Sequence, residues 1–209
     1  MDSDIKKINV SARGVTPLIM HNVQMADPLN RWTLESASLK NKRSKKTESD
    51  IEKLYEIGFL SSLYWSNELN GLYMPTDNIR KMLLEAARGC DSKGAKKQIV
   101  GVRFTEYLGY PIETENRDNI EAIRDNPKNR YFKIVKVGMA KVPNVRAIFH
   151  QWSFDFQMEI DASIVNVSTV EEWVEYAGDR VGIGSRRPYG PTPGEYGRFV
   201  VEKFEEINE

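Results

Sequence analysis

The chain has 209 residues, and its 30 Lys and Arg balance its 30 Asp and Glu, which gives a formal net charge of zero. Proteins that coat nucleic acid over their whole surface keep a large positive surplus, and disordered tails combine high net charge with few aromatics, so both classes are excluded. With 40% apolar and 10% aromatic residues the chain can bury a core, and its length fits one large domain, residues 1–209.

Cysteine, histidine and hydropathy exclude further classes. The single cysteine, Cys90, excludes an internal disulfide and a cysteine-clustered zinc site, and two histidines far apart argue against a histidine metal site. No apolar run approaches the roughly 20 residues that a membrane helix needs. The opening segment MDSDIKKINV lacks the apolar core of a signal peptide. We therefore expect a soluble cytoplasmic protein with no metal, no cofactor and no membrane partner.

The first third of the chain predicts a strand, an irregular segment, a helix and a hairpin. Residues 5–14 alternate apolar and polar side chains, as a half-buried strand does. Residues 15–32 contain two prolines and should be irregular. Residues 48–63 have the three–four spacing of an amphipathic helix with Thr47 as its N-cap, and Asn-Gly within 64–75 marks a hairpin.

The middle of the chain predicts the clearest helix. Residues 76–90 carry an apolar stripe at Ile79, Met82, Leu83, Ala86 and Ala87. Thr76 is placed to cap this helix. Residues 99–108 return to a strand pattern. Residues 111–130 are polar, and we expect an excursion with one short helix.

Two long strands follow, over 131–142 and 145–161, joined by a Pro-Asn turn. The second strand has apolar side chains at its even positions and polar ones at its odd positions from 151. His150 lies on the apolar side, which predicts a core histidine. Phe154 and Phe156 share that side, so we expect them in the core rather than in a base-stacking platform.

The last elements are a helix over 169–180, a Gly- and Pro-rich segment over 181–197 and a strand over 198–204. Ser168 and Glu171 have the spacing of a capping box. The main elements thus follow a βαββαβ order, which is typical of an antiparallel sheet with both helices on one face. The predicted fold class is α+β, ferredoxin-like or RRM-like, with a helical insertion at 33–69 and a glycine-rich loop at 182–197.

Three groups of residues are candidate nucleic-acid contacts. In the loop at 182–197, glycines let a backbone approach a phosphate, arginines supply charge-assisted bonds and a tyrosine can stack on a base. Basic residues at 40–46 and 80–97 would add charge to the same groove, although solvated surface lysines and an ordinary surface loop are the alternatives. The candidate residues are Lys40, Lys42, Arg43, Lys45, Lys46, Arg80, Lys81, Arg88, Lys93, Lys96, Lys97, Gly182, Gly184, Arg186, Arg187 and Tyr189.

Residues 71–88, GLYMPTDNIRKMLLEAAR, resemble the motif of the RAMP superfamily, the CRISPR-associated RNA-binding proteins. In that motif a strand ends in Ile-Pro and two small residues, and a helix follows with Lys or Arg near its first turn. Residues 14–22, GVTPLIMHN, look like the start of the family. Residues 182–199, GIGSRRPYGPTPGEYGRF, look like its glycine-rich loop before the last strand. The three segments occur in the family's order and span nearly the whole chain.

The nearest resemblance within the superfamily is to the backbone subunits of CRISPR effector complexes, which hold guide RNA along a filament. It implies a modified RNA-recognition fold whose glycine loop and helix-start basic residues hold single-stranded RNA. The chain departs from the family at Lys81 and Leu84, where Gly and Arg are frequent. The insertion at 33–69 lies outside the motif pattern, which suggests a stand-alone, phage-encoded relative acting in the host cytoplasm.

Three functional hypotheses follow. The first is non-catalytic binding of single-stranded RNA or DNA, with RNA preferred, as a homo-oligomer or filament. The second is an endoribonuclease, for which the resemblance implies His21 as a general base or Asp27 as the catalytic residue. The third is a phage protein that mimics a CRISPR subunit and engages an effector complex.

Overall fold

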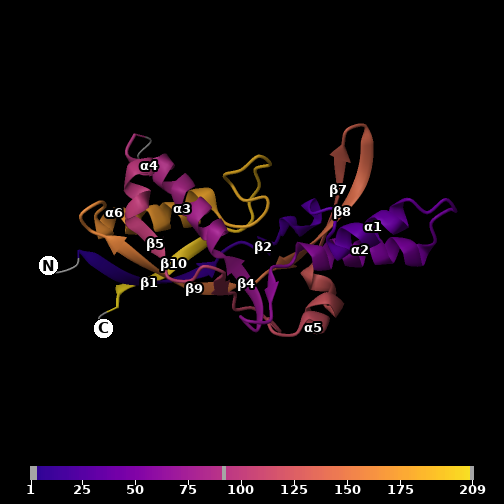
Figure 1. Cartoon of the computed structure of the whole chain (residues 1–209), viewed down its shortest axis with the longest axis horizontal. Coiled ribbons are helices and arrows are strands. Elements are labelled where there is room, and N and C mark those ends of the chain that lie inside the picture. Colours follow the sequence, from indigo (N-terminus) through magenta and orange to yellow (C-terminus); the bar gives the residue numbers. More distant parts are fainter. Residues whose placement is uncertain (1–3, 91–92, 208–209) are drawn as a thin grey trace.

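A four-stranded antiparallel sheet forms one end of the molecule (Figure 1). The computed structural model describes residues 4–90 and 93–207. In space the four strands follow the order β10-β1-β9-β5, with every neighbouring pair antiparallel. Numbered along the chain, this order is 4-1-3-2, as in a ferredoxin-like fold. The strands are β1 (Ile5–Gly14), β5 (Val102–Phe104), β9 (Ser153–Asp161) and β10 (Phe199–Glu206).

Two helices cover one face of this sheet, which confirms the predicted fold class. They are α3 (Thr76–Cys90) and α6 (Val167–Tyr176), which continues into a π-helical turn (Ala177–Val181). Alternate side chains of β1 and β9 are buried, and their neighbours in sequence face outward. The period of two therefore separates a core face from a polar face. Phe154 and Phe156, each 1% exposed, lie in the core as predicted.

Two insertions into the ferredoxin-like plan build the rest of the molecule. The first, between β1 and α3, contains β2 (Leu18–Ile19), the 3₁₀ turn η1 (Val23–Ala26), α1 (Arg31–Lys40), α2 (Glu48–Ser62), β3 (Trp65–Ser66) and β4 (Gly71–Pro75). The second, between β5 and β9, contains β6 (Gly109–Pro111), α5 (Ile120–Asp125), η3 (Pro127–Asn129), β7 (Arg130–Val137) and β8 (Ala140–Phe149). The short helices α4 (Ala95–Gln98) and η2 (Ile99–Gly101) join α3 to β5.

Strands β7 and β8 form a hairpin whose tip stands away from the rest of the molecule (Figure 1). At its foot, β8 pairs with β2 and packs on α2. The contact with α2 is close because Gly58 has no side chain: a Cβ there would lie 3.1 Å from the Val145 carbonyl oxygen. A single hydrophobic cluster runs from Ile8 in the sheet to Phe59 in α2, so the insertions share one core with the sheet.

Several local predictions are confirmed. Helix α2 begins after Thr47, which forms a reciprocal capping box with Asp50. The hairpin predicted within 64–75 is the β3–β4 pair. The helix predicted over 76–90 is α3. No helix within residues 4–90 and 93–207 is both long enough and apolar enough to cross a bilayer.

Other local predictions are wrong at element ends. Thr76 does not cap α3, because it is the first residue of the helix and its hydroxyl donates to the Glu106 carbonyl at 2.5 Å. Helix α6 begins at Val167 after Asn166, so Ser168 lies inside the helix rather than at a capping box. The strand predicted over 99–108 shortens to β5, because a 3₁₀ turn occupies its first three residues.

The prediction of two strands joined at Pro143-Asn144 is also wrong. The turn lies at Gly138-Met139, where Gly138 has a φ of +59°, and Pro143 pairs with Ile134 within the hairpin. The long second strand is broken after Phe149, which separates β8 from β9. His150 falls in this break and is exposed, with Nε2 3.2 Å from the Lys128 carbonyl oxygen, so it is not a core histidine.

Candidate nucleic-acid interface

The glycine-rich loop is fixed to the segment that follows β1. Gly184 has a φ of +83°, and a Cβ at this position would lie 2.7 Å from the Ile19 carbonyl oxygen. The Ser185 amide donates to that same oxygen at 2.8 Å, and the Gly197 amide donates to the Pro17 carbonyl at 2.9 Å. Of the backbone amides near 182–184 predicted to assist phosphate binding, the Gly182 amide donates to the Ala177 carbonyl at 2.7 Å. The glycines therefore let the loop dock closely on the protein.

Two adjacent arginines of the loop have opposite surroundings. The Arg187 Nη1 atom lies 2.5 Å from Oε2 of Glu85 on α3, and the two side chains are only 13% and 12% exposed. Arg187 therefore anchors the loop to α3, and its predicted phosphate contact does not fit this placement. Arg186 has a φ of +55°, and its guanidinium carbon lies 5.9 Å from the centre of the Tyr131 ring on β7.

Residues from three separate segments meet at the base of the hairpin, and we call them the hairpin-foot cluster: His21, Tyr131, Arg146, Ser185 and Arg186. Arg146 on β8 connects them, since its Nη1 donates to the Ser185 hydroxyl at 2.5 Å. Its Nη2 lies 3.4 Å from Nε2 of His21. The cluster joins the segment after β1, the hairpin and the glycine-rich loop. In sequence, Arg146 is 125 residues from His21 and 39 residues from Ser185.

The hairpin-foot cluster carries positive charge with no ion-paired acid among the described residues. Within residues 4–90 and 93–207, neither Arg146 nor Arg186 forms an ion pair with a carboxylate. Burial, together with the charge of Arg186, lowers the pKa of Arg146. Burial and the charge of Arg146 also lower the pKa of His21, although part of this side chain is exposed. Two guanidiniums without a carboxylate partner among the described residues make this point of the surface attractive to an anion.

The hairpin adds a second basic feature, which the sequence predictions missed. Residues 130–146 contain five Lys or Arg and no Asp or Glu. The strand pairing places Tyr131 opposite Arg146 and Lys133 opposite Asn144, so Lys133 shares the face of the cluster. Large apolar side chains are exposed on the hairpin as well. Phe132 (49% exposed) and Ile134 (52%) lie on the face opposite Lys133, and Met139 (95%) lies at the turn. The sequence signal that could have predicted this surface is the absence of Asp and Glu from two neighbouring strands that contain several Lys and Arg.

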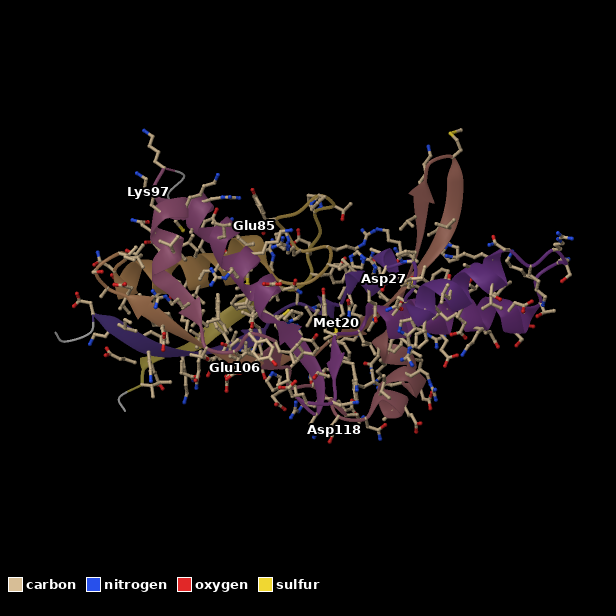
Figure 2. All side chains as sticks on the ribbon, viewed as in Figure 1. Met20, Asp27, Glu85, Lys97, Glu106 and Asp118 are labelled. Carbon is tan, nitrogen blue, oxygen red and sulfur yellow. The ribbon has the colours of Figure 1, made fainter. Side chains whose placement is uncertain are left out.

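The other predicted basic groups do not converge on one groove. Residues 40–46 lie in and beside the α1–α2 connection at one end of the molecule, whereas Lys97 lies at the other end (Figures 1 and 2). Lys42 is held by Asp50 at 2.7 Å, and Arg80 lies over the Phe104 ring at 5.5 Å. Lys46 is partly buried, and the remaining predicted side chains of these groups and of the loop tip are exposed: Lys40, Arg43, Lys45, Lys81, Arg88, Lys93, Lys96 and Tyr189.

The two candidate catalytic residues have different settings. His21 belongs to the hairpin-foot cluster. The Asp27 carboxylate accepts the Leu29 amide at 2.9 Å, as a turn residue does before a proline. Among the residues that the structure describes, no group of three or more His, Cys, Asp or Glu is arranged to hold a metal ion.

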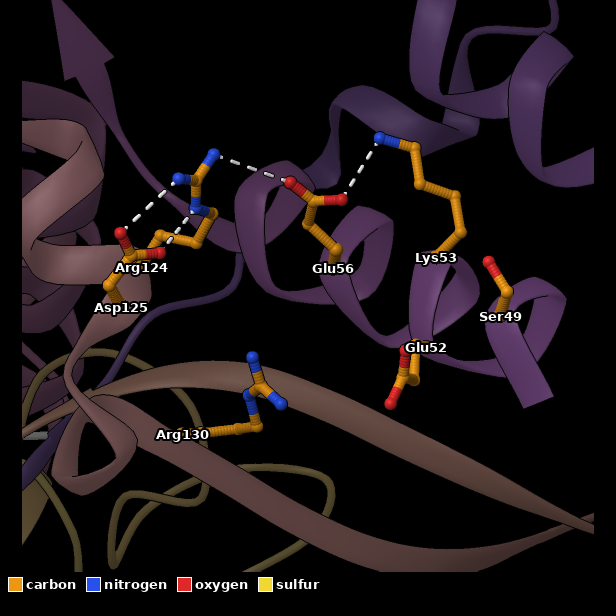
Figure 3. A pocket seen from close by; sticks show the side chains of 7 residues that line it. All are labelled: Ser49, Glu52, Lys53, Glu56, Arg124, Asp125 and Arg130. Carbon is orange, nitrogen blue, oxygen red and sulfur yellow. Dashed lines mark hydrogen bonds and ion pairs between the residues drawn. The ribbon is translucent and has the colours of Figure 1, made fainter.

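The pocket between α2, α5 and β7 has a volume of about 480 Å³ and a mixed charge (Figure 3). Lys53 lies 2.9 Å from Glu56, and Arg124 lies 3.5 Å from Glu56 and 2.8 Å from Asp125. These pairs neutralise one another, so the pocket lacks the positive surplus of the hairpin-foot cluster. Its lining residues are Ser49, Glu52, Lys53, Glu56, Arg124, Asp125 and Arg130.

Comparison with known proteins supports the fold. No protein-family model matches the chain, and no curated protein matches it. Among solved structures, a chain of the cryo-EM structure of the Type III-B Cmr-beta bound to cognate target RNA is similar, with a TM-score of 0.53 and 12% sequence identity. The similarity covers 97% of this chain and 61% of that chain, so this chain spans less than two thirds of its length. The likeness indicates a RAMP-like fold.

Proposed function

We propose that the protein binds single-stranded RNA, with the phosphate backbone held at the hairpin-foot cluster and along the adjoining face of the β7–β8 hairpin. The observation that carries the proposal is the pair of guanidiniums of Arg146 and Arg186, which lack a carboxylate partner within the described residues. Arginine matches the geometry of phosphate oxygens and forms charge-assisted hydrogen bonds to them. Lys133 extends the positive surface along the hairpin.

Exposed apolar side chains support a single strand over a duplex. Phe132 and Ile134 are 49% and 52% exposed on the face of the hairpin opposite Lys133, although the Phe132 ring packs edge-on against Tyr55, and Met139 at the turn is 95% exposed. Exposure of large apolar side chains on a strongly basic hairpin is costly unless a partner covers them. Unpaired bases expose faces that can stack on such side chains, whereas a duplex hides these faces. The preference for RNA over DNA rests on the similar chain, whose structure is bound to cognate target RNA.

The test is the affinity for single-stranded RNA, single-stranded DNA and duplex RNA across a range of salt concentrations, measured by fluorescence anisotropy. For a single strand, the logarithm of the binding constant should fall with the logarithm of salt concentration by about 0.7 per phosphate contact. Arg186→Asn should flatten the slope by about that amount, since it removes one contact. Arg103→Gln, which removes an exposed charge on β5 outside every candidate group, is the matched control and should leave the slope unchanged. Salt-insensitive binding, or none, would refute the proposal.

One observation favours an endoribonuclease as a second candidate function. The lowered pKa of His21 keeps its imidazole neutral near pH 7, as a general base must be, and Arg146 lies 3.4 Å away. Labelled RNA incubated with the protein, with and without Mg²⁺, tests this directly. Cleavage that His21→Gln abolishes would support it, and intact RNA under both conditions would remove it.

Assembly belongs to the proposal as well. We propose that copies of the chain line up along one RNA, and that the insertion at 33–69, which contains α1 and α2, supplies contacts to a neighbour or to a CRISPR effector complex. Size analysis of complexes on RNAs of increasing length should show stepwise growth. Pull-down from a host with an effector complex tests the second partner. A variant lacking the surface charges of 42–46, which lie in the insertion, should capture less of the complex than the wild type.

A further inference from the structure

The hairpin-foot cluster has the features of a site for one compact anion. Its donors come from three segments, and backbone bonds fix these segments to one another: Met20 donates to Ala147 at 3.0 Å, and Ser185 donates to Ile19 at 2.8 Å. The arginine side chains are therefore presented by a braced framework rather than by a free loop. Preorganised donors lose less freedom when a ligand binds.

The backbone of Arg186 supports a ligand role. Its φ of +55° is a left-handed conformation that is strained for a residue with a Cβ. Such conformations persist where surrounding structure imposes them, and they gather at ligand sites. The Tyr196 amide donates to the Arg186 carbonyl at 3.2 Å, which helps to hold this conformation.

The charge of the cluster exceeds that of one internal phosphate. Arg146 and Arg186 carry two positive charges at pH 7, and the neutral imidazole of His21 lies beside Arg146 with a nitrogen that can join the site. An internal phosphodiester carries one negative charge, so it leaves a positive excess. A phosphate monoester carries about −1.5 to −2 at pH 7 and offers three acceptor oxygens, which matches the two guanidiniums and the neighbouring imidazole.

We propose that the hairpin-foot cluster binds a phosphate monoester, and that on RNA it selects a terminal phosphate over internal phosphodiesters. This inference rests on the proposed function only in one respect, which is that RNA is the polymer that carries the phosphate. A free small phosphate has the same chemistry, so the experiment separates the two sources.

The first arm compares RNAs of one sequence that end in a 5′-phosphate, a 3′-phosphate or hydroxyl groups at both ends. One of the two phosphorylated RNAs should bind about tenfold more tightly than the RNA with hydroxyl groups at both ends, because its terminal phosphate adds a charge-assisted contact. Arg186→Asn should abolish this preference without strain, because Asn adopts a left-handed backbone readily. The control Arg103→Gln should keep the preference. Equal affinity for all three RNAs would overturn the inference while leaving RNA binding intact.

The second arm uses inorganic phosphate alone. Phosphate should raise the melting temperature of the wild type above that in chloride at equal ionic strength, and Arg186→Asn should lose this shift. The same shift in both proteins would mean an adventitious ion only and would overturn the inference. A shift that depends on Arg186, without any RNA binding, would support a small phosphate as ligand and refute the proposed RNA function.

Discussion

The ion pair between Glu85 and Arg187 allows a sharp test of how the glycine-rich loop is held. Glu85→Gln would leave the Arg187 guanidinium without its carboxylate, in a place where only 13% of that side chain is exposed. Removing one partner of a buried ion pair costs about 3–5 kcal/mol, and the residual exposure favours the lower end, about 3 kcal/mol. For a chain of this size, each kcal/mol lowers the melting temperature by about 2–4 °C, so the expected decrease is about 6–12 °C.

The assay is thermal unfolding followed by circular dichroism, with an exposed ion pair as matched control. Arg13 and Glu202 form such a pair, in which the side chains are 54% and 48% exposed. Glu202→Gln should cost less than about 1 kcal/mol, because water screens the pair. Glu85→Leu combined with Arg187→Met should recover most of the stability, since it removes both buried charges together.

Equal melting temperatures for Glu85→Gln and Glu202→Gln would refute this reasoning. The same result would return Arg187 to the group of available phosphate ligands. A large loss in Glu85→Gln that the double variant does not recover would show that Glu85 acts through contacts other than its ion pair.

Three further predictions concern the loop, the cluster and a helix cap. Gly184→Ala should destabilise the fold by about 1–3 kcal/mol in urea unfolding, since its φ is +83° and the new Cβ would meet a β2 carbonyl at 2.7 Å; unchanged stability would mean a looser loop. The folded pKa of His21 lies below its usual 6.5, so the unfolded chain binds the proton more readily and stability should fall as pH drops through 6.5; His21→Gln should reduce this acid sensitivity in urea midpoints. Hydrogen bonds from Lys42 and Thr47 lower the pKa of Asp50 to about 2, so the stability it contributes is present above 3.8 and lost as pH falls toward 2; an NMR titration should find this pKa below 3.8, and Thr47→Ala should raise it.

Periodic patterns predicted the core of the fold well. Alternation over residues 5–14 and the helical stripe over 76–90 reflect burial on one side, which is a property of the chain itself. The βαββαβ order then leaves few sheet arrangements, because connections are short and helices pack on one face. The insertions were harder to place, since their short elements carry too few residues for a clear period.

The position of the hairpin turn shows where local signals compete. Both Gly138 and Pro143-Asn144 are turn signals in the sequence. Gly138 forms the turn because it adopts the positive φ that the tight connection requires, while Pro143 is accommodated in the exposed hairpin. The pairing of β7 with β8, which a short stretch of sequence does not reveal, selects Gly138 over Pro143-Asn144 as the turn. The sequence pattern alone therefore misplaced it.

The candidate site depended on contacts that sequence patterns do not contain. Arg186 and Arg187 are neighbours in the chain, but Glu85, about one hundred residues earlier, removes one of them from the surface. The dense basic run at 40–46 led to a predicted site at one end of the molecule. The pairing of β7 with β8 instead brings basic residues that are dispersed in sequence together near the middle of the molecule. Charge that is spread along two strands becomes a patch only once the strands pair.

The most direct test of RNA binding at this middle site compares two double variants of equal charge by salt-dependent binding to single-stranded RNA. Arg186→Asn with Lys133→Gln removes charge at the hairpin, and Lys45→Gln with Lys97→Gln removes it at the two ends. The first pair of substitutions should flatten the salt slope by about 1.4, which is two contacts of about 0.7 each, and should weaken binding. The second pair should leave both quantities unchanged. An equal or larger effect from the second pair would contradict the account.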